Sequence, residues 1–302
     1  MTDELPGVAS LQRLRAGGRS PADIRRAVRA ADLVRAHRGV YLDASPPTEL
    51  TLIAAALVHA GPESTAVVSS ALRIHGIGGI VGDRVPEIAV PPGLEKHQRS
   101  GLSLHFWDIP LDQRTVVGGL PVTTIARTLA DAVRLLPRMQ AVACVDSAMS
   151  QHLIAPESLD QVARLLHRRR HCVSGRTRLG EARFDAQSPL ETRVRLRADD
   201  AGLRPDALQV PIYDHDELLG FGDMGYRLPR GGWLIVEADG RSVHERPEAL
   251  LRDRERQNAF LARARAMIVR FTWEDASLDH RIPDVVRPIL RRAGWRPSPR
   301  RP

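Results

Sequence analysis

Two carboxylates near the C-terminus stand inside apolar runs, and this pattern constrains the fold more than any other feature of the chain. Glu237 ends the run WLIV, and Asp223 lies within residues 218–226. Carboxylates are rarely buried without a partner. If the two runs are antiparallel strands joined by a turn near Pro229, Asp223 lies opposite Val236 or Glu237, with side chains roughly 5 Å apart when they share a face.

A third carboxylate follows two residues later. Asp239 lies on the same face of the strand as Glu237, because side chains alternate along a strand. Three negative groups so close together require protons or a cation. Mg²⁺ and Mn²⁺ prefer oxygen ligands, polarise a phosphodiester and activate water. The sequence therefore predicts a Mg²⁺ or Mn²⁺ site for phosphodiester hydrolysis.

The segments around these carboxylates predict the order αβββαβ over residues 188–275. Ser188 and Pro189 are typical of a helix start, and Gly202 of a helix end. The expected elements are a helix to about residue 201, strands near 208–213, 218–226 and 233–239, a helix near 247–265, and the strand AMIVRFTW.

This domain resembles the PD-(D/E)XK nucleases, most closely an uncharacterised endonuclease-related family near the very-short-patch-repair endonucleases. The resemblance covers SPLE, Asp223, VEADGRSVH, RDRERQNAFL and VRFTWED. It implies that Glu191, Asp223 and Glu237 hold the metal and that Asp239 and His244 lie beside them as catalytic groups. It also places Arg252, Asp253 and Arg256 on the following helix, where the two arginines contact nucleic acid.

The chain departs from that family pattern at one position. Asp239 stands where the superfamily has a lysine, and Lys96, the only lysine, is in another domain. Arginine cannot replace it as a base because its pKa stays above 12. Hydrolysis would then depend on metal-bound water, with His244 as a base.

Each candidate residue also has an ordinary structural explanation. Glu191 stands three residues after Ser188, as in a capping box. Asp239 precedes a glycine, as in a turn that ends a strand. His244 is an exposed loop histidine on this view, and the charges near Arg252 pair along their helix.

The N-terminal residues 1–45 predict a small winged helix-turn-helix. Residues 20–42 combine a helix start at Ser20 with a hairpin around Gly39, and the ending RGVYL resembles the N-terminal module of AbiEi-type antitoxins of type IV toxin-antitoxin systems. That resemblance implies DNA binding; a helical domain that packs on its neighbour is the alternative. The candidate phosphate or groove contacts are Arg25, Arg26, Arg29, Arg35 and Arg38.

The rest of the chain predicts no further catalytic site. Residues 46–166 have a mixed α+β pattern, expected of a connecting or regulatory domain. Residues 167–187 are expected to form a basic linker, and 276–302 a basic tail. The net charge of +8 is concentrated at the N-terminus and in these two segments, where it can neutralise phosphates or simply be solvated.

Composition narrows the class of protein. No run of about 18 apolar residues occurs, so no membrane span is expected. The two cysteines lack CxxC spacing, as expected in a reducing bacterial cytoplasm. We therefore expect an α/β protein with nucleic acid, above all DNA, as its partner. The first hypothesis is a metal-dependent endonuclease; the alternatives are a non-enzymatic antitoxin-like DNA-binding regulator with a degenerate nuclease fold, or protein-protein regulation through the middle domain.

Overall fold

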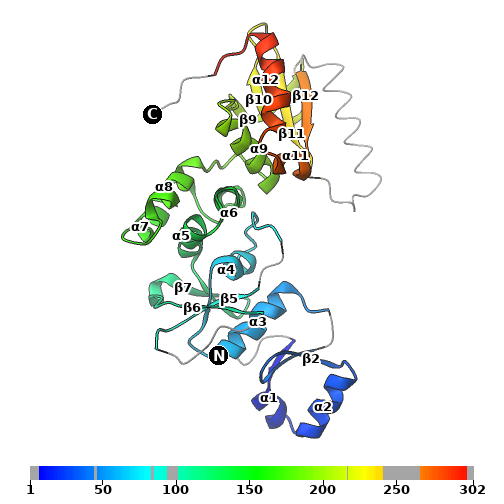
Figure 1. The fold of residues 1–302 in the computed structure, drawn as a ribbon, viewed down its shortest axis with the longest axis vertical. Coiled ribbons are helices and arrows are strands. Elements are labelled where there is room, and N and C mark those ends of the chain that lie inside the picture. Colours follow the sequence, from blue (N-terminus) through cyan, green and yellow to red (C-terminus); the bar gives the residue numbers. More distant parts are fainter. Residues whose placement is uncertain are drawn as a thin grey trace. The chain divides into compact units, whose positions relative to one another are not determined.

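The computed structural model describes residues 7–43, 46–82, 85–93, 101–215, 217–240 and 266–297 (Figure 1). The chain forms two compact units, Met1–Glu181 and Ala182–Pro302. Both contain helices and β-sheets, so the expectation of a mixed α/β protein is confirmed. Among the described residues, no helix is long and apolar enough to cross a membrane.

The N-terminal module, residues 7–43, forms a three-stranded sheet in the order β1-β3-β2 beside two short helices. Ser20 caps α2 in a capping box with Asp23, and Pro21 occupies the first helical turn, as its sequence predicts. The β2–β3 hairpin turns near Gly39, whose φ is 79°. The elements are β1 (Val8–Ser10), α1 (Leu11–Ala16), α2 (Pro21–Arg29), β2 (Leu33–His37) and β3 (Val40–Asp43).

This module shares its core with the segment that follows it. Val8, Val40 and Leu42 belong to the same buried cluster as Ile53 of α3 (Glu49–Ala60). The predicted domain boundary at residue 45 therefore separates residues that pack together. The sequence did not reveal this packing because the N-terminal module and α3 each have an apolar face. The hydrophobic pattern alone does not say which apolar faces pack against each other.

A mixed five-stranded sheet in the order β6-β5-β4-β8-β7 forms the rest of this core. Its strands β4 and β8 are parallel and its edge pair β7–β8 is antiparallel. The elements are β4 (Thr65–Ala66), α4 (Val68–Ile74), β5 (Glu87–Val90), β6 (Ser103–Phe106), η1 (Leu111–Gln113), β7 (Arg114–Val117), β8 (Leu120–Thr123), α5 (Ile125–Leu135) and α6 (Arg138–Ser150).

The basic stretch expected to be a linker, residues 167–187, contains a packed helix. α8 (Cys172–Glu181) follows η2 (Pro156–Ser158) and α7 (Leu159–Leu165), and it buries Gly175 and Leu179. Arg178 Nη1 donates to the carbonyl oxygens of Val133 and Leu136 at 2.6 and 2.9 Å, which satisfies the C-terminal end of α5. At least one of the many arginines in this stretch therefore stabilises the fold.

The second unit is built on a four-stranded sheet in the order β12-β11-β10-β9. Strands β9, β10 and β11 are antiparallel neighbours, and β12 adds parallel to β11. This is the strand order along the chain that the sequence predicts, with the expected helix at 247–265 outside the described residues. The elements are α9 (Pro189–Asp200), β9 (Ala207–Asp214), β10 (Glu217–Arg227), β11 (Trp233–Ala238), β12 (Ala266–Phe271), α11 (Trp273–Ser277) and α12 (Arg281–Ala293).

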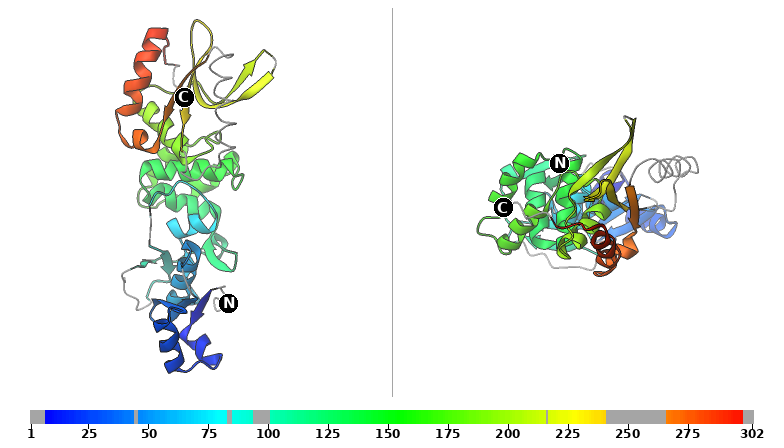
Figure 2. Two further views of the ribbon diagram at one scale, coloured as in Figure 1. Left: turned by 90° about the vertical axis from the view of Figure 1, so that its right-hand side faces the viewer. Right: turned by 90° about the horizontal axis from the view of Figure 1, so that it is seen from above.

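Helices α9 and α12 pack on one face of this sheet, and Figures 1 and 2 show α12 beside the strands. Leu190 of α9 and Leu290 of α12 belong to one buried cluster with Leu234 and Val236. The segment 276–302 was expected to be a basic tail, and its described residues 276–297 thus complete the core. Its apolar residues recur at helical spacing, and Gly294 ends α12 with φ 74°.

Candidate functional site

The N-terminal module carries its predicted arginines on the surface. Ile24 of α2 is buried, whereas Arg25, Arg26 and Arg29 of the same helix are exposed, as are Arg35 and Arg38 of the hairpin. Arg26 lies 3.6 Å from Asp23, in a pair of exposed side chains that contributes little to stability.

The charge of this module is strongly positive. Arg25 and Arg29 are four residues apart, so they are neighbours on the surface of α2. Residues 7–43 contain eight arginines and three aspartates. Three exposed arginines of this group were not among the sequence-predicted contacts: Arg13, Arg15 and Arg19. Arg13 and Arg15 lie on α1, and Arg19 lies just after it. Their position shortly before the predicted helix start at Ser20 was the sign in the sequence that they belong to the same basic surface.

In the second unit, Glu191 is buried in a polar setting without an arginine partner among the described residues. Ser188 caps α9 by accepting from the Glu191 N–H at 3.1 Å, as predicted. The Glu191 carboxylate, however, accepts from the N–H of Gln187 at 2.9 Å, one residue before the cap, and from Gln209 Nε2 at 3.2 Å. Burial, and then the nearby charge of Asp223, raise the pKa of Glu191 from 4.5 to about 7.

Asp223 lies where β10 twists locally. A Cβ at Gly222 would be 2.5 Å from Ile235 Cγ2 on one face of the sheet, whereas Met224 packs in the cluster on the other face. Residues 222 and 224 would share a face in a regular strand. Gln209, opposite Asp223 in the β9–β10 register, has φ 47°. The irregularity therefore involves both strands at this level.

Asp223 lies near enough to Glu191 for its charge to raise the pKa of Glu191. Asp223 Oδ2 accepts from the N–H of Ala238 at 2.7 Å, so its side chain takes part in the β10–β11 ladder. Gln209, its neighbour across the β9–β10 ladder, donates to Glu191. We call Glu191 and Asp223 the acidic pair. The register Met224 to Val236, extended by one residue, places Asp223 opposite Glu237, one of the two predicted positions.

Glu237 has a different partner from the one expected. Its carboxylate accepts from Arg270 Nε of β12 at 2.7 Å. Strand alternation places Glu237 on the face of Ile235, whereas α9 packs against the opposite face through Leu190. Of the predicted metal ligands, Glu237 is thus paired with an arginine, and Glu191 lies near Asp223. In the described part of the chain, no group of three or more His, Cys, Asp or Glu side chains could hold a metal ion.

The remaining predicted residues add little to this geometry. Asp239 follows β11, is half-buried, and donates its N–H to the carbonyl oxygen of Phe271 at 2.8 Å. The other candidates, His244, Arg252, Asp253 and Arg256, lie outside the described residues.

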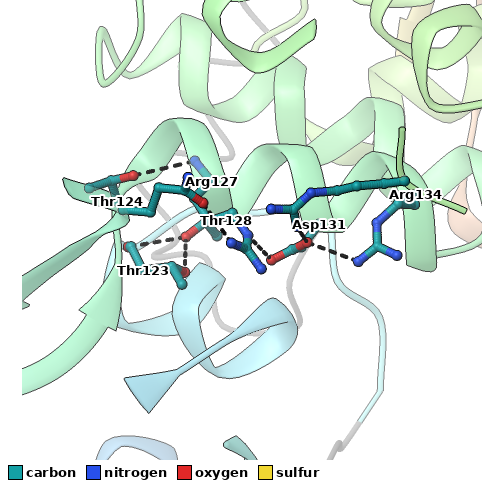
Figure 3. Close-up of polar contacts among 8 residues, drawn as sticks. Thr123, Thr124, Arg127, Thr128, Asp131 and Arg134 are labelled. Atoms are coloured by element: carbon teal, nitrogen blue, oxygen red, sulfur yellow. Dashed lines mark hydrogen bonds and ion pairs between the residues drawn. The ribbon is translucent and has the colours of Figure 1, made fainter. Parts of the chain in front are cut away.

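A buried polar network on α5 was missed by the sequence interpretation. Thr124 caps this helix, and the hydroxyls of Thr123 and Thr128 lie 2.7 Å apart (Figure 3). Arg127 and Asp131, one turn apart, are almost fully buried and pair at 2.7 Å. The segment TTIARTLADAVRLL reads as an apolar helix, and the signal in it was the spacing of the charges: arginine, aspartate four residues on, and arginine three further.

Residues 64–181, which run from β4 to the end of α8, match the family model of the AbiEi antitoxin C-terminal domain. This stretch is antitoxin-like. The resemblance expected from sequence lay on residues 20–42, so the match falls on the neighbouring segment, where no functional signature was expected. The match covers less than half of the chain.

Three further proteins are similar over longer stretches. Two uncharacterized proteins of Mycobacterium tuberculosis, MT2308 of strain CDC 1551 and Rv2248 of strain H37Rv, are each 29% identical over 229 residues, which cover 76% of this chain and 82% of theirs. The crystal structure of the RV2827C protein from the same species aligns with a TM-score of 0.39 and 18% identity, over 60% of this chain and 78% of that one.

Proposed function

We propose that this chain is an antitoxin-like regulator that binds DNA through its N-terminal module. The observation that carries the proposal is the exposed arginine surface of α2 and the β2–β3 hairpin, on the N-terminal side of the antitoxin-like stretch. Helices followed by a basic hairpin suit a winged helix-turn-helix, in which a helix enters the major groove and the hairpin contacts the backbone. Arginine is suited to both tasks because its guanidinium binds phosphates and guanine edges with two donors.

A band-shift titration on the DNA upstream of the gene tests this proposal. The full chain is expected to bind with an affinity that falls steeply as salt rises, because phosphate contacts release counterions. Removing two of these contacts in Arg25→Ala/Arg29→Ala is expected to lower the slope of log affinity against log salt by roughly two and to weaken binding about tenfold or more.

The matched control is Arg164→Ala/Arg170→Ala, which removes two exposed arginines from the antitoxin-like stretch. It carries the same net charge as the test variant and should bind nearly as well as the wild type. Absence of salt-sensitive binding by the wild type would remove the proposal, and an equal loss in both variants would show that net charge alone is responsible.

A second candidate function rests on the acidic pair. We propose that the second unit is a PD-(D/E)XK-like domain that hydrolyses phosphodiesters. Glu191 and Asp223 repel each other, which a divalent cation would relieve, and carboxylate oxygens suit Mg²⁺ or Mn²⁺. Such an ion, when bound, would polarise a phosphodiester and acidify water. The domain lacks the usual lysine at Asp239, and Arg270 engages Glu237, so Glu191 and Asp223 are the two side chains we expect to hold the ion.

Cleavage of duplex and single-stranded DNA with Mg²⁺ or Mn²⁺ tests this second candidate. Asp223→Ala should abolish cleavage and weaken Mn²⁺ binding measured by calorimetry. Glu274→Ala, which removes an exposed carboxylate of the same unit, should do neither. Equal cleavage by wild type and Asp223→Ala would exclude the acidic pair as the catalytic site.

A further inference from the structure

Three arginines of the antitoxin-like stretch converge on one aspartate. Asp131 of α5 is completely buried; its Oδ2 pairs with Arg127 Nε at 2.7 Å, and its Oδ1 with Arg134 Nη2 at 3.0 Å and Arg169 Nη1 at 3.5 Å. Arg127 and Arg134 come from α5, one turn to either side of Asp131 (Figure 3), and Arg169 comes from the segment between α7 and α8. We call these four residues the arginine cluster.

The cluster carries an excess of positive charge. Arg127 also donates to Gln113 Oε1 at 2.6 Å, but that acceptor is neutral. Asp131 is the only carboxylate among the described residues that pairs with any of the three arginines, so two positive charges are left without a counter-charge. Burial, and then repulsion by Arg127 and Arg134, lower the pKa of Arg169 despite the opposing effect of Asp131.

The donors of the cluster are not all used. Within the described part of the chain, Arg134 Nε is buried and has no hydrogen-bond partner. An unsatisfied donor on a charged group is costly, and native structures retain one where a ligand or an ordered water completes it. The indole ring of Trp107 lies beside the cluster, and its centroid is 5.8 Å from the Cζ atoms of both Arg127 and Arg134.

The three arginines of the cluster differ in their exposure. The side chain of Arg127 is 2% exposed, whereas those of Arg134 and Arg169 are 12% and 28% exposed. Arg134 and Arg169 are therefore the members of the cluster that solvent reaches, whereas Arg127 and Asp131 are buried. A group that binds there is held by partly buried guanidinium donors, in contrast to the exposed arginines of the N-terminal module.

We propose that Arg134 and Arg169, supported by Arg127, bind the phosphate group of a small ligand such as a phosphate monoester or nucleotide. A terminal phosphate carries close to two negative charges at neutral pH, which equals the excess charge of the cluster. Its oxygens match the paired donors of guanidinium groups. A terminal phosphate on a small molecule reaches recessed arginines better than the backbone of a duplex does.

This proposal is independent of the proposed DNA binding, because the two involve different arginines. A ligand held by the cluster would bind within the antitoxin-like stretch, outside the N-terminal module. Either proposal can therefore fail while the other holds.

Calorimetric titration of the full chain with inorganic phosphate and with ATP, at constant ionic strength set by chloride, tests the proposal. We expect saturable binding of at least one of the two. Arg169→Ala should weaken that binding at least about tenfold, since a charge-assisted contact is lost. Arg169→Lys should recover part of the affinity, because it keeps the charge without the two-donor geometry.

The matched control is Arg170→Ala, which removes the exposed neighbouring arginine and should leave the affinity within about twofold of the wild type. Circular dichroism and thermal unfolding establish whether each variant is folded. If Arg169→Ala does not fold, Arg169→Lys decides the question: weaker binding than the wild type supports the proposal, and unchanged binding contradicts it. Absence of binding of both probes, equal weakening by Arg169→Ala and Arg170→Ala, or a requirement of Arg169 for duplex DNA alone would each overturn the proposal.

Discussion

The two units bury carboxylates in opposite electrostatic settings. Asp131 in the first unit is surrounded by three arginines, whereas Glu191 in the second accepts from neutral donors among the residues that the structure describes and faces the charge of Asp223. The same chemical group therefore faces an excess of cations in one place, whereas in the other it is driven towards its neutral form. The first setting calls for an anion, and the second for a proton or a cation.

The largest effect expected from this comparison is at Asp131. Asp131→Asn leaves three buried or half-buried guanidiniums without their counter-charge, and removal of one partner from a buried ion pair costs about 3–5 kcal/mol. Denaturant unfolding of the full chain measures the loss in the free energy of unfolding. Asp160→Asn, at an exposed carboxylate of α7, should change it by less than about 0.5 kcal/mol. A loss at Asp131 no larger than at Asp160 would show that the arginines do not depend on it.

Glu191 should behave in the opposite sense. Its pKa is raised from 4.5 to about 7 in the folded state, so the folded chain binds more protons than the unfolded chain between these values. The contribution of Glu191 to stability therefore falls as pH rises from about 4.5 to 7, and the penalty is fully present above 7. Glu191→Gln removes the penalty and should stabilise the second unit at pH 8 by roughly 1–3 kcal/mol relative to its effect at pH 4.5.

Unfolding of the Glu191→Gln variant at both pH values measures this difference. Glu274→Gln, at an exposed carboxylate of α11, should show no such pH dependence. Mn²⁺ sharpens the comparison: if the acidic pair binds it, the ion should stabilise the wild type at pH 8 more than it stabilises Glu191→Gln. An effect of Glu191→Gln on the free energy of unfolding that is the same at pH 8 and pH 4.5 would contradict the raised pKa.

The smallest effect is expected at the Glu237 carboxylate, whose electrostatic setting is intermediate between those of Asp131 and Glu191. Arg270 and Glu237 form one ion pair with exposed fractions of 30% and 12%. Arg270→Gln should cost about 1 kcal/mol, because the pair is partly solvated and glutamine still offers a donor. Denaturant unfolding measures it, with Arg296→Gln as an exposed control in the same unit. A loss as large as that at Asp131 would place Glu237 in a fully buried setting.

Local elements of the fold could be predicted because their signals lie within a few residues. Ser20 and Ser188 mark helix starts, and both cap as expected. The three antiparallel strands and the turn near Pro229 follow from alternating apolar patterns and turn residues, and the register agrees with simple counting. The packing of α8 and α12 was not predicted, since a high density of arginine concealed their apolar faces.

The candidate sites were predictable to a lesser degree. Sequence indicated that Glu191, Asp223 and Glu237 are unusual, but not that Arg270 would engage one of them. The local irregularity at Asp223 coincides with the positive φ of Gln209, for which its sequence neighbours gave no sign.

The sequence by itself determined the capped helices α2 and α9 and the three antiparallel strands, and that acidic and basic side chains would stand among apolar ones. The tertiary structure alone decided which of those charges are neighbours. Arg169 meets Asp131 across 38 residues of chain, and Arg270 meets Glu237 across 33. The physical reason is the sequence range of the two kinds of interaction. Helix caps and hydrophobic periodicity involve residues within one turn or one strand of each other. A buried charge is instead stabilised or destabilised by any group that packing brings within a few ångströms of it, however distant in sequence.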